Sequence, residues 1–318
     1  MDAEKDGPVS YVYGPVPSRR LGLSLGVDII PPKICTLDCV YCQLGRTTAK
    51  STDRRDFVDI DAVLSELRQK LQAGIRADYI TIGGSGEPTL NTRLGEVVDG
   101  VRRLTDIPVA ILTNGTLLCQ AQVRAECARA DVVIPSLDAG DAAVFEAVNR
   151  PARDITIEKL VSGLQRFRGE FAGQIWLEVF LIAGVNTGPE QIEKIRGLIH
   201  QIRPDKIHLN TAVRPPAEPN VEPLSREALD AIVRQIGPNC EVIGEAPAVL
   251  TERHDRRAEA DVVSMLKRRP CSVEDIASGL GMNRSEVVKH VTRLRDLGGI
   301  HAEQRGGVTY FHARPDAT

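Results

Sequence analysis

Three cysteines fall within one short segment and are the residues of this chain best suited to chemistry. Cys35, Cys39 and Cys42 follow a C-x-x-x-C-x-x-C spacing, and Tyr41 directly precedes the last of them. Thiolates are the usual ligands of a cubane iron–sulfur cluster, in which each of four irons takes one external ligand. Three thiolates leave the fourth iron open, which is typical of a catalytic rather than a structural metal site. The spacing therefore predicts a [4Fe–4S] site.

Two other uses of these cysteines were weighed. A disulfide is disfavoured, because the chain has seven cysteines, an odd number, and no secretory segment is evident. Zinc would need a fourth ligand, yet the nearest histidine in sequence is His200. The remaining cysteines form no second C-x-x-C pair and are expected to be small buried residues: Cys119, Cys127, Cys240 and Cys271. A zinc-stabilised binding protein stays open as an alternative.

The composition is that of an ordinary globular protein, with a net charge of −3 and a hydrophobic fraction of 42%. The length of 318 residues allows one large α/β domain or two unequal domains. No apolar run is long enough to cross a membrane, and the first thirty residues lack a basic region followed by an apolar one. We therefore expect a cytoplasmic protein without a membrane partner.

Short apolar runs alternate with segments of helical periodicity along most of the chain, and six helices are predicted between or after the strands: Asp59–Ala73, Arg93–Leu104, Gln120–Ala128, Asp141–Asn149, Ile157–Phe167 and Pro189–Ile202. Six runs are predicted as strands: Leu23–Ile30, Asp78–Ile82, Pro108–Leu112, Asp131–Ser136, Ile175–Ile182 and Lys206–Asn210. The glycines and prolines of Tyr13–Gly22 predict a shaped loop before the first strand. The alternation predicts an α/β fold, a partial (β/α)6 TIM-like barrel over residues 1–250, with its chemistry after the strands.

Polar residues do collect after the predicted strands. The Gly83–Thr89 segment follows the second strand, and its glycines allow the backbone to approach a ligand closely. The residues that we expect to face a substrate follow later strands: Asn114, Asn186, Asn210 and Arg214. Ordinary capping of loops is the alternative role for the three asparagines.

The cysteine spacing, the Gly-Ser-Gly-Glu-Pro sequence and the six βα units together resemble the radical SAM superfamily, from about Tyr11 to Glu245. The resemblance implies that the open iron binds the amino and carboxylate groups of S-adenosylmethionine. It also implies a set of residues around this cofactor: Tyr41, Ser85, Gly86, Glu87, Ser136, Asp138 and Gly184. Ser85, Gly86 and Glu87 would line the methionine pocket. Ser136 and Asp138 would bind the ribose or methionyl group, and the stretch ending at Gly184 would contact adenine.

The resemblance further implies a reaction. A one-electron reductant such as flavodoxin or ferredoxin reduces the cluster, the carbon–sulfur bond of S-adenosylmethionine breaks, and the 5′-deoxyadenosyl radical abstracts hydrogen from a substrate. The substrate, RNA or a polypeptide among the options, is not identified. The Gly14–Asp28 segment looks like the branch related to wyosine-forming tRNA enzymes. Those enzymes carry additional cysteines for a second cluster, whereas no cysteine precedes Cys35 here.

Residues 251–318 differ in texture from the barrel. Three helices and two short strands are predicted: Ala258–Arg269, Ser272–Gly279, Ser285–Leu297, Ile300–Gln304 and Val308–His312. Ser272 stands at an N-cap position and Asp275 at the capping-box position. The order resembles a small winged helix-turn-helix domain. Its slight basic excess leaves nucleic acid, polypeptide and oligomerisation open as roles. The candidate phosphate contacts are Arg284, Lys289, Arg293 and Arg305.

The two regions together also allow a second function of another class. An iron–sulfur cluster can sense redox state while a winged helix binds DNA, which describes a regulator rather than an enzyme. The predicted barrel and its glycine-rich segment favour the enzyme, because a sensor needs neither.

Overall fold

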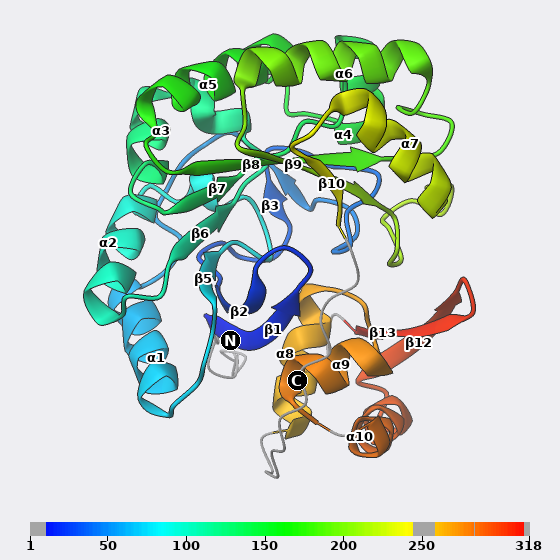
Figure 1. The fold of residues 1–318 in the computed structure, drawn as a ribbon. Coiled ribbons are helices and arrows are strands. Elements are labelled where there is room, and N and C mark those ends of the chain that lie inside the picture. The colour runs from blue at the N-terminus through cyan, green and yellow to red at the C-terminus, as the bar shows by residue number, and fades with distance from the viewer. Residues whose placement is uncertain (1–10, 244–257, 283, 315–318) are drawn as a thin grey trace, which may run out of the picture.

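The computed structural model describes residues 11–243, 258–282 and 284–314 of the chain (Figure 1). A curved sheet with helices along its outer side forms the larger part, and residues from 258 onward gather beside its first two strands. The predicted domain boundary between residues 250 and 251 lies outside the described residues.

The sheet has eight strands in the order β1-β2-β5-β6-β7-β8-β9-β10. The six predicted strands are confirmed and run parallel to one another: β2 (Gly22–Val27), β5 (Tyr79–Ile82), β6 (Val109–Leu112), β7 (Val132–Ile134), β8 (Gln174–Leu181) and β9 (Lys206–Thr211). A seventh parallel strand, β10 (Cys240–Val242), pairs with β9 and was not predicted. The α/β class with a parallel sheet is confirmed, and the carboxyl ends of the strands lie along one edge.

The helices return the chain between parallel strands: α1 (Ile60–Gln72), α2 (Leu94–Leu104), α3 (Ala121–Cys127), α4 (Ala142–Asn149), α5 (Ile157–Glu170), α6 (Pro189–Ile202) and α7 (Arg226–Ile236). The first six were predicted, whereas α7 was missed. Buried side chains of these helices and of the strands form one large apolar core. No helix in the described ranges is both long enough and apolar enough to span a membrane.

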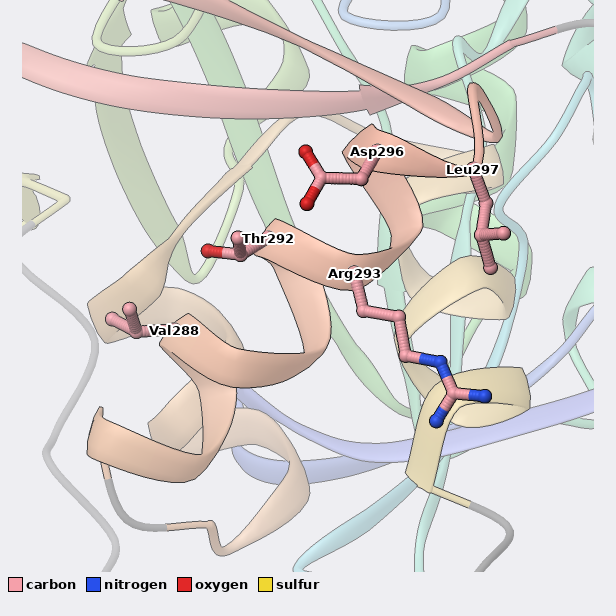
Figure 2. A pocket seen from close by; sticks show the side chains of 5 residues that line it. All are labelled: Val288, Thr292, Arg293, Asp296 and Leu297. Atoms are coloured by element: carbon pink, nitrogen blue, oxygen red, sulfur yellow. The ribbon is translucent and has the colours of Figure 1, made fainter.

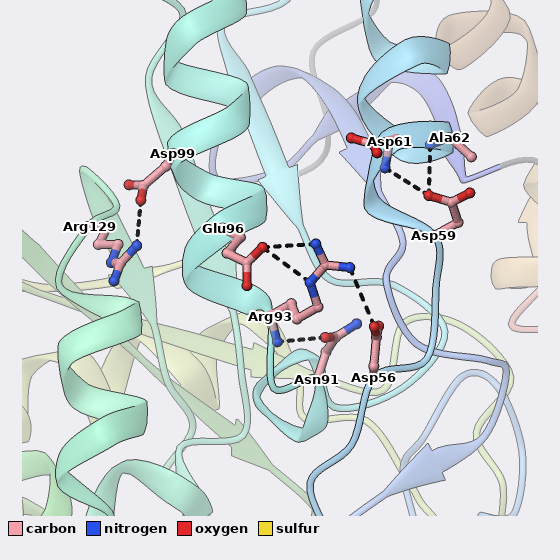
Figure 3. Close-up of polar contacts among 9 residues, drawn as sticks. All are labelled: Asp56, Asp59, Asp61, Ala62, Asn91, Arg93, Glu96, Asp99 and Arg129. Atoms are coloured by element: carbon pink, nitrogen blue, oxygen red, sulfur yellow. Dashed lines mark hydrogen bonds and ion pairs between the residues drawn. The ribbon is translucent and has the colours of Figure 1, made fainter.

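Polar contacts hold the chain where it enters these helices (Figure 3). The Asp59 carboxylate accepts hydrogen bonds from the backbone N–H groups of Asp61 and Ala62, so it caps the N-terminus of α1. Beside α2, Arg93 binds the carboxylate of Glu96 at 2.9 Å and that of Asp56 at 3.4 Å. These contacts are partly exposed and orient loops rather than build the core.

The segment predicted as a shaped loop is instead strand β1 (Val12–Ser18), so that prediction was wrong. It pairs antiparallel with β2 and forms the edge of the sheet, with an irregularity in register between Tyr13 and Val16. An edge strand tolerates proline, because the side that lacks an N–H donor can face away from the ladder. After the turn that follows β1, Leu21 packs into the barrel interior against apolar side chains: Ala110, Val132, Ile134 and Trp176.

Six elements make up the C-terminal part: α8 (Ala258–Arg268), β11 (Cys271–Ser272), α9 (Val273–Leu280), α10 (Arg284–Asp296), β12 (Ile300–Arg305) and β13 (Val308–Ala313). The three predicted helices and two predicted strands are confirmed, and the short β11 adds a third strand to an antiparallel sheet of order β11-β13-β12. The capping box of Ser272 and Asp275 at the start of α9 is also confirmed.

The C-terminal part packs directly on the barrel. Val16 of β1 lies in the same apolar cluster as Met265 of α8 and Phe311 of β13. The Tyr310 hydroxyl donates to the Val213 carbonyl oxygen at 2.8 Å, and Arg305 donates to the carbonyl oxygen of Val221. The β12–β13 hairpin therefore rests on the chain that follows β9. Arg305, a predicted phosphate contact, is occupied by this packing.

Candidate functional site

The cysteine segment is anchored at the carboxyl end of the sheet. Its first part forms β3 (Ile34–Cys35), which pairs with β4 (Ala49–Lys50). The Lys33 N–H donates to the Ser85 carbonyl oxygen at 2.6 Å, and the Glu87 N–H donates to that of Ile34 at 3.0 Å. Two backbone hydrogen bonds thus tie the cysteine segment to the glycine-rich turn after β5.

Gly86 makes this contact possible. A Cβ atom at this position would lie 2.4 Å from the Ile34 carbonyl oxygen and 2.5 Å from Cγ2 of Ile30. Both distances are shorter than van der Waals contact, and the carbonyl belongs to backbone that has no room to move. Gly86 therefore serves the close approach of two loops.

Glu87 faces the protein interior rather than an open pocket. Its carboxylate is buried and accepts hydrogen bonds from the Thr89 N–H and hydroxyl, the Thr113 hydroxyl and the Asn114 N–H. Burial raises the pKa of Glu87, although these donors oppose the shift. The residue orders the loop after β6, and its contact with a cofactor stays a prediction.

Two asparagines donate to cysteine sulfurs. The Nδ2 atom of Asn114 lies 3.4 Å from Sγ of Cys35, and that of Asn149 lies 3.4 Å from Sγ of Cys39. Amide donors of this kind stabilise a thiolate and tune a cluster bound to it. Asn114 also donates to the Thr36 hydroxyl, so its side chain faces the cysteine segment, and its contact with a substrate stays a prediction. Asn149 was missed, since no local pattern marks it.

The thiols lie in a low-dielectric setting. Burial, with the nearby Glu87 carboxylate, raises the pKa of Cys35 to about 12, and burial also raises the pKa values of Cys39 and Cys42. Bound iron offsets such an effect, because a metal ion deprotonates the thiol that coordinates it. Within the described residues, no three His, Cys, Asp or Glu side chains converge on a point that a single metal ion would occupy.

Asp138 forms hydrogen bonds that hold the cysteine segment in place. Its carboxylate accepts hydrogen bonds from the Tyr41 hydroxyl at 2.5 Å, Asn149 Nδ2 at 2.7 Å and the Phe180 N–H at 2.8 Å. The Tyr41 ring stacks on the Phe180 ring with centroids 3.8 Å apart. Asp138 is buried and its oxygens are engaged, so it holds Tyr41 and Asn149 in place instead of reaching a ribose.

A cavity of about 310 Å³ opens beside the cysteine segment. Four predicted site residues line it: Tyr41, Cys42, Asn210 and Arg214. The strands contribute further side chains from the barrel interior, among them Ser24, Thr81, Leu112 and Glu178. The C-terminal part adds Met265, Arg268 and Arg269. The cavity is therefore built by both parts of the chain.

A charged pair crosses this cavity. Arg20, from the turn after β1, forms an ion pair with Glu178 of β8, and Asn210 Nδ2 donates to Glu178 at 3.0 Å. Glu178 was not predicted, although a single charged residue inside the apolar run of β8 is a signal for it. Of the predicted substrate contacts, Asn210 is thus on the cavity wall and bound to a neighbouring carboxylate.

The remaining predicted residues lie away from the cavity surface. Asn186 is fully buried, donates to the carbonyl oxygens of Asp138 and Phe180 at 2.7 Å, and accepts from the Ile182 N–H. It therefore caps a loop in this structure, and its contact with a substrate stays a prediction. Gly184 is on an exposed turn at a positive φ of 73°. Ser136, Ser85 and Gly86 are outside the set of residues that line the cavity.

Arg214 lines the cavity but is not free to bind a substrate alone. Its Nη2 atom donates to Oδ1 of Asp275 at 2.9 Å, while its Nε atom is buried without a hydrogen-bond partner within the described part of the chain. The pair joins the segment after β9 to the start of α9. A second, open hollow lies on α10 between Val288 and Leu297 (Figure 2), and one of the candidate phosphate contacts, Arg293, lines it.

Comparison with known proteins gives the family from sequence and a similar fold from a solved structure. The family model of the radical SAM superfamily matches residues 29–199. UPF0026 protein MJ1312 from Methanocaldococcus jannaschii is 32% identical over 288 residues, which cover 88% of each chain. A solved structure described as TYW1 with a lysine-pyruvate adduct bound has a TM-score of 0.51 at 16% identity, over 70% of this chain and 75% of that one. At this identity the likeness concerns the fold alone.

A further relative is longer than this chain. The protein named GTPase Obg from Brachyspira hyodysenteriae is 36% identical over 303 residues, which cover 94% of this chain and 45% of that protein. The present sequence contains no Gly-Lys pair, so it has no GxxxxGK[ST] phosphate loop of the P-loop type. The family model and the UPF0026 relative, which match most of the barrel, agree with the cysteine segment described above. The chain therefore belongs to the radical SAM superfamily, whose members bind a [4Fe–4S] cluster and S-adenosylmethionine.

Proposed function

We propose that this chain is a radical SAM enzyme that abstracts hydrogen from a substrate held in the cavity beside Cys42. The observation that carries the proposal is the cysteine segment itself, whose Cys35 and Cys39 sulfurs accept hydrogen bonds from Asn114 and Asn149 next to that cavity. Cys35, Cys39 and Cys42 would hold the cluster. When bound, the cluster and S-adenosylmethionine supply a 5′-deoxyadenosyl radical.

The chain's own residues bind, orient and shield. Gly86 allows the turn after β5 to touch the cysteine segment, and Glu87 fixes the loop that carries Asn114. Tyr41, held by Asp138 and stacked on Phe180, forms the wall of the cavity between the cysteines and the barrel interior. Met265 of α8 covers the cavity from the other side, which limits the access of water.

Two further proposals concern the setting of the enzyme. A one-electron reductant such as flavodoxin or ferredoxin is the expected electron source, because iron–sulfur chemistry of this kind needs an external electron. We place the protein in the cytoplasm, since all seven cysteines are free thiols and a reducing compartment keeps them so.

We also propose that residues 251–318 form a winged helix-turn-helix domain. The support is the order α8, β11, α9, α10, β12, β13, with the hairpin as the wing. This wing contacts the barrel through Tyr310 and Arg305, which favours a role in closing the active site. Val288 of α10 and Leu297, directly after this helix, are 47% and 72% exposed (Figure 2). This exposed face could bind a polypeptide or a nucleic acid.

The test is anaerobic reconstitution with iron and sulfide, followed by dithionite and S-adenosylmethionine. We expect 5′-deoxyadenosine from the natural chain and none from a variant with Cys35→Ala, Cys39→Ala and Cys42→Ala. A matched control, Cys240→Ala, removes a buried thiol on β10 and should still form the nucleoside. Equal nucleoside from the triple variant would overturn the assignment.

The redox-sensing regulator is the rival outcome of the same experiment. It requires that a cluster assembles without cleavage of S-adenosylmethionine, and that the chain binds a specific DNA duplex in one redox state only. The likeness of Gly14–Asp28 to the wyosine-related branch adds tRNA to the substrates that should be tried.

A further inference from the structure

Five arginines line the cavity, and they come from three separate parts of the chain. Arg19 and Arg20 are in the turn after β1, Arg214 follows β9, Arg268 ends α8 and Arg269 directly follows it. Only one carboxylate, that of Glu178, is among the residues that line the same space. A partly buried cavity with this imbalance carries a strongly positive potential.

Three of these arginines have carboxylate partners. Arg20 pairs with Glu178, Arg214 pairs with Asp275 at 2.9 Å, and Nε of Arg268 lies 3.8 Å from Asp28 while its guanidinium stacks over the Tyr13 ring at 4.1 Å. The three carboxylates named here are therefore already paired with arginines.

Arg19 and Arg269 remain. Among the described residues, neither guanidinium has a recorded ion pair, and Nη2 of Arg269 is buried without a hydrogen-bond partner. An unpaired buried donor on a charged group is costly unless a ligand satisfies it. The two side chains approach the cavity from opposite parts of the protein, the β1 turn and α8.

Burial and the neighbouring arginines lower the pKa values of two members of the group. Burial, followed by the neighbouring Arg214, lowers the pKa of Arg19 to about 10. Burial, followed by Arg19, lowers the pKa of Arg20 to about 9. Both groups stay protonated at neutral pH, and Glu178 neutralises Arg20, so the positive charge of Arg19 is the one of the two that has no paired carboxylate within the described part of the chain.

S-adenosylmethionine cannot neutralise the positive charge of the cavity. It carries two positive groups, the sulfonium and the ammonium, and only one carboxylate. We propose that the cavity binds a small dianionic molecule, a phosphate monoester or a dicarboxylate, through Arg19 and Arg269. The assignment rests on the proposed function in that this molecule would be the substrate of the radical reaction. Guanidinium groups suit both sources, since their paired N–H donors match phosphate and carboxylate oxygens.

The cavity's enclosure favours a small molecule over a nucleic acid strand. Its walls come from the barrel interior and from α8, and its volume of about 310 Å³ is at the lower end of the range for small-molecule sites. The dianion would lie between Arg19 of the β1 turn and Arg269 directly after α8, so its binding would also hold the C-terminal part against the barrel.

The experiment is calorimetric titration of the reconstituted full chain, without reductant, with the phosphate monoester methyl phosphate in one arm and malonate in the other. We expect one site per chain for at least one anion, and the stronger arm identifies the phosphate or the carboxylate source. Arg19→Gln and Arg269→Gln should each weaken binding by about tenfold or more, because a hydrogen bond to a charged group is lost. Arg269→Lys keeps the charge and should retain part of the affinity.

Arg196→Gln is the matched control, because this arginine lies on the outer helix α6 and pairs with Glu193 at 2.7 Å. It should bind like the natural chain. The proposal fails if neither anion binds, if both Arg→Gln variants bind unchanged, or if an RNA oligonucleotide binds more tightly than either small anion at the same sites. Circular dichroism identifies a variant that does not fold. In that case the binding measured for the variant at the other arginine tests the proposal.

This experiment separates the two proposals. Anion binding that depends on Arg19 and Arg269, with no 5′-deoxyadenosine formed in the reductive assay, leaves the site standing and removes the radical reaction. Nucleoside formation without anion binding supports the radical reaction and removes the anion site.

Discussion

Nη2 of Arg214 donates to Oδ1 of Asp275 across 2.9 Å, although 61 residues separate the two in the chain. Asp275 also completes the capping box with Ser272 at the start of α9. One carboxylate therefore both begins a helix of the C-terminal part and fastens that part to the segment after the barrel strand β9. The side chain of Arg214 is only 6% exposed, so this contact is shielded from solvent.

Breaking this pair should destabilise the protein. Arg214→Met leaves a partly buried carboxylate without its cation, and we expect the free energy of unfolding to fall by about 2–4 kcal/mol. A double-mutant cycle with Asp275→Asn should give a coupling energy of about 1–3 kcal/mol by urea unfolding. The control cycle is Arg226 with Asp230, an exposed pair on α7 at the same 2.9 Å, for which about 0.5 kcal/mol or less is expected. Equal couplings in the two cycles would contradict the buried role.

The same pair should leave a signature in acid. Burial alone would raise the pKa of Asp275, but Arg214 and the Ser272 N–H outweigh it and hold the pKa below its ordinary value. A carboxyl with a lower pKa in the folded state adds stability above the unfolded pKa, about 3.9, and that stability is lost as pH falls through the folded pKa. The difference in unfolding free energy between the natural chain and Asp275→Asn should be constant above about pH 5 and shrink below about pH 4. A difference that grows on acidification would refute this.

Gly86 should not tolerate a methyl group. Gly86→Ala places Cβ 2.4 Å from the Ile34 carbonyl oxygen, and we expect a loss of about 2 kcal/mol or more together with less iron bound after reconstitution. The matched control is Gly197→Ala on α6, where nothing lies within 4 Å of the added carbon. That change should stabilise the helix by about 0.5–1 kcal/mol. Thermal unfolding and iron analysis of both variants measure the contrast, and similar behaviour would show that the loop contact is not tight.

Asn114 should tune the cluster rather than bind a substrate. Asn114→Leu removes the amide donor from Cys35, and hydrogen bonds to sulfur raise the potential of a cluster. If the net value of the bond is about 1 kcal/mol, the one-electron potential should fall by roughly 40 mV. Redox titration followed by electron paramagnetic resonance measures it. Gln165→Leu, at an exposed position on α5, is the control and should leave the potential unchanged. An unchanged potential in Asn114→Leu would leave the residue a purely structural role.

Local patterns predicted much of this fold. The apolar runs of β5 and β6 and the periodicity of α1 and α6 need only neighbouring residues to be read, because strand alternation and helix faces repeat every two to four residues. The Ser272 capping box is equally local. The edge strand β1 was not predicted, because its Gly-Pro pair is typical of a loop. Only its pairing with β2 identifies it as a strand.

The position of the cysteine segment and the family both follow from the sequence alone, since the spacing of Cys35, Cys39 and Cys42 and the Gly-Ser-Gly-Glu-Pro turn are readable without a structure. The roles of the residues around that segment do not. Asn114 and Asp138 were expected to face ligands, and in this structure both form hydrogen bonds with other residues of the protein. No sequence pattern marks Asn149. Only the packed structure decided which side chains meet across 60 to 110 residues of chain, including Arg214 with Asp275 and the five arginines of the cavity. The physical reason is that a side chain's partner is set by how helices and sheet pack, whereas sequence periodicity reports only which face of its own element it occupies.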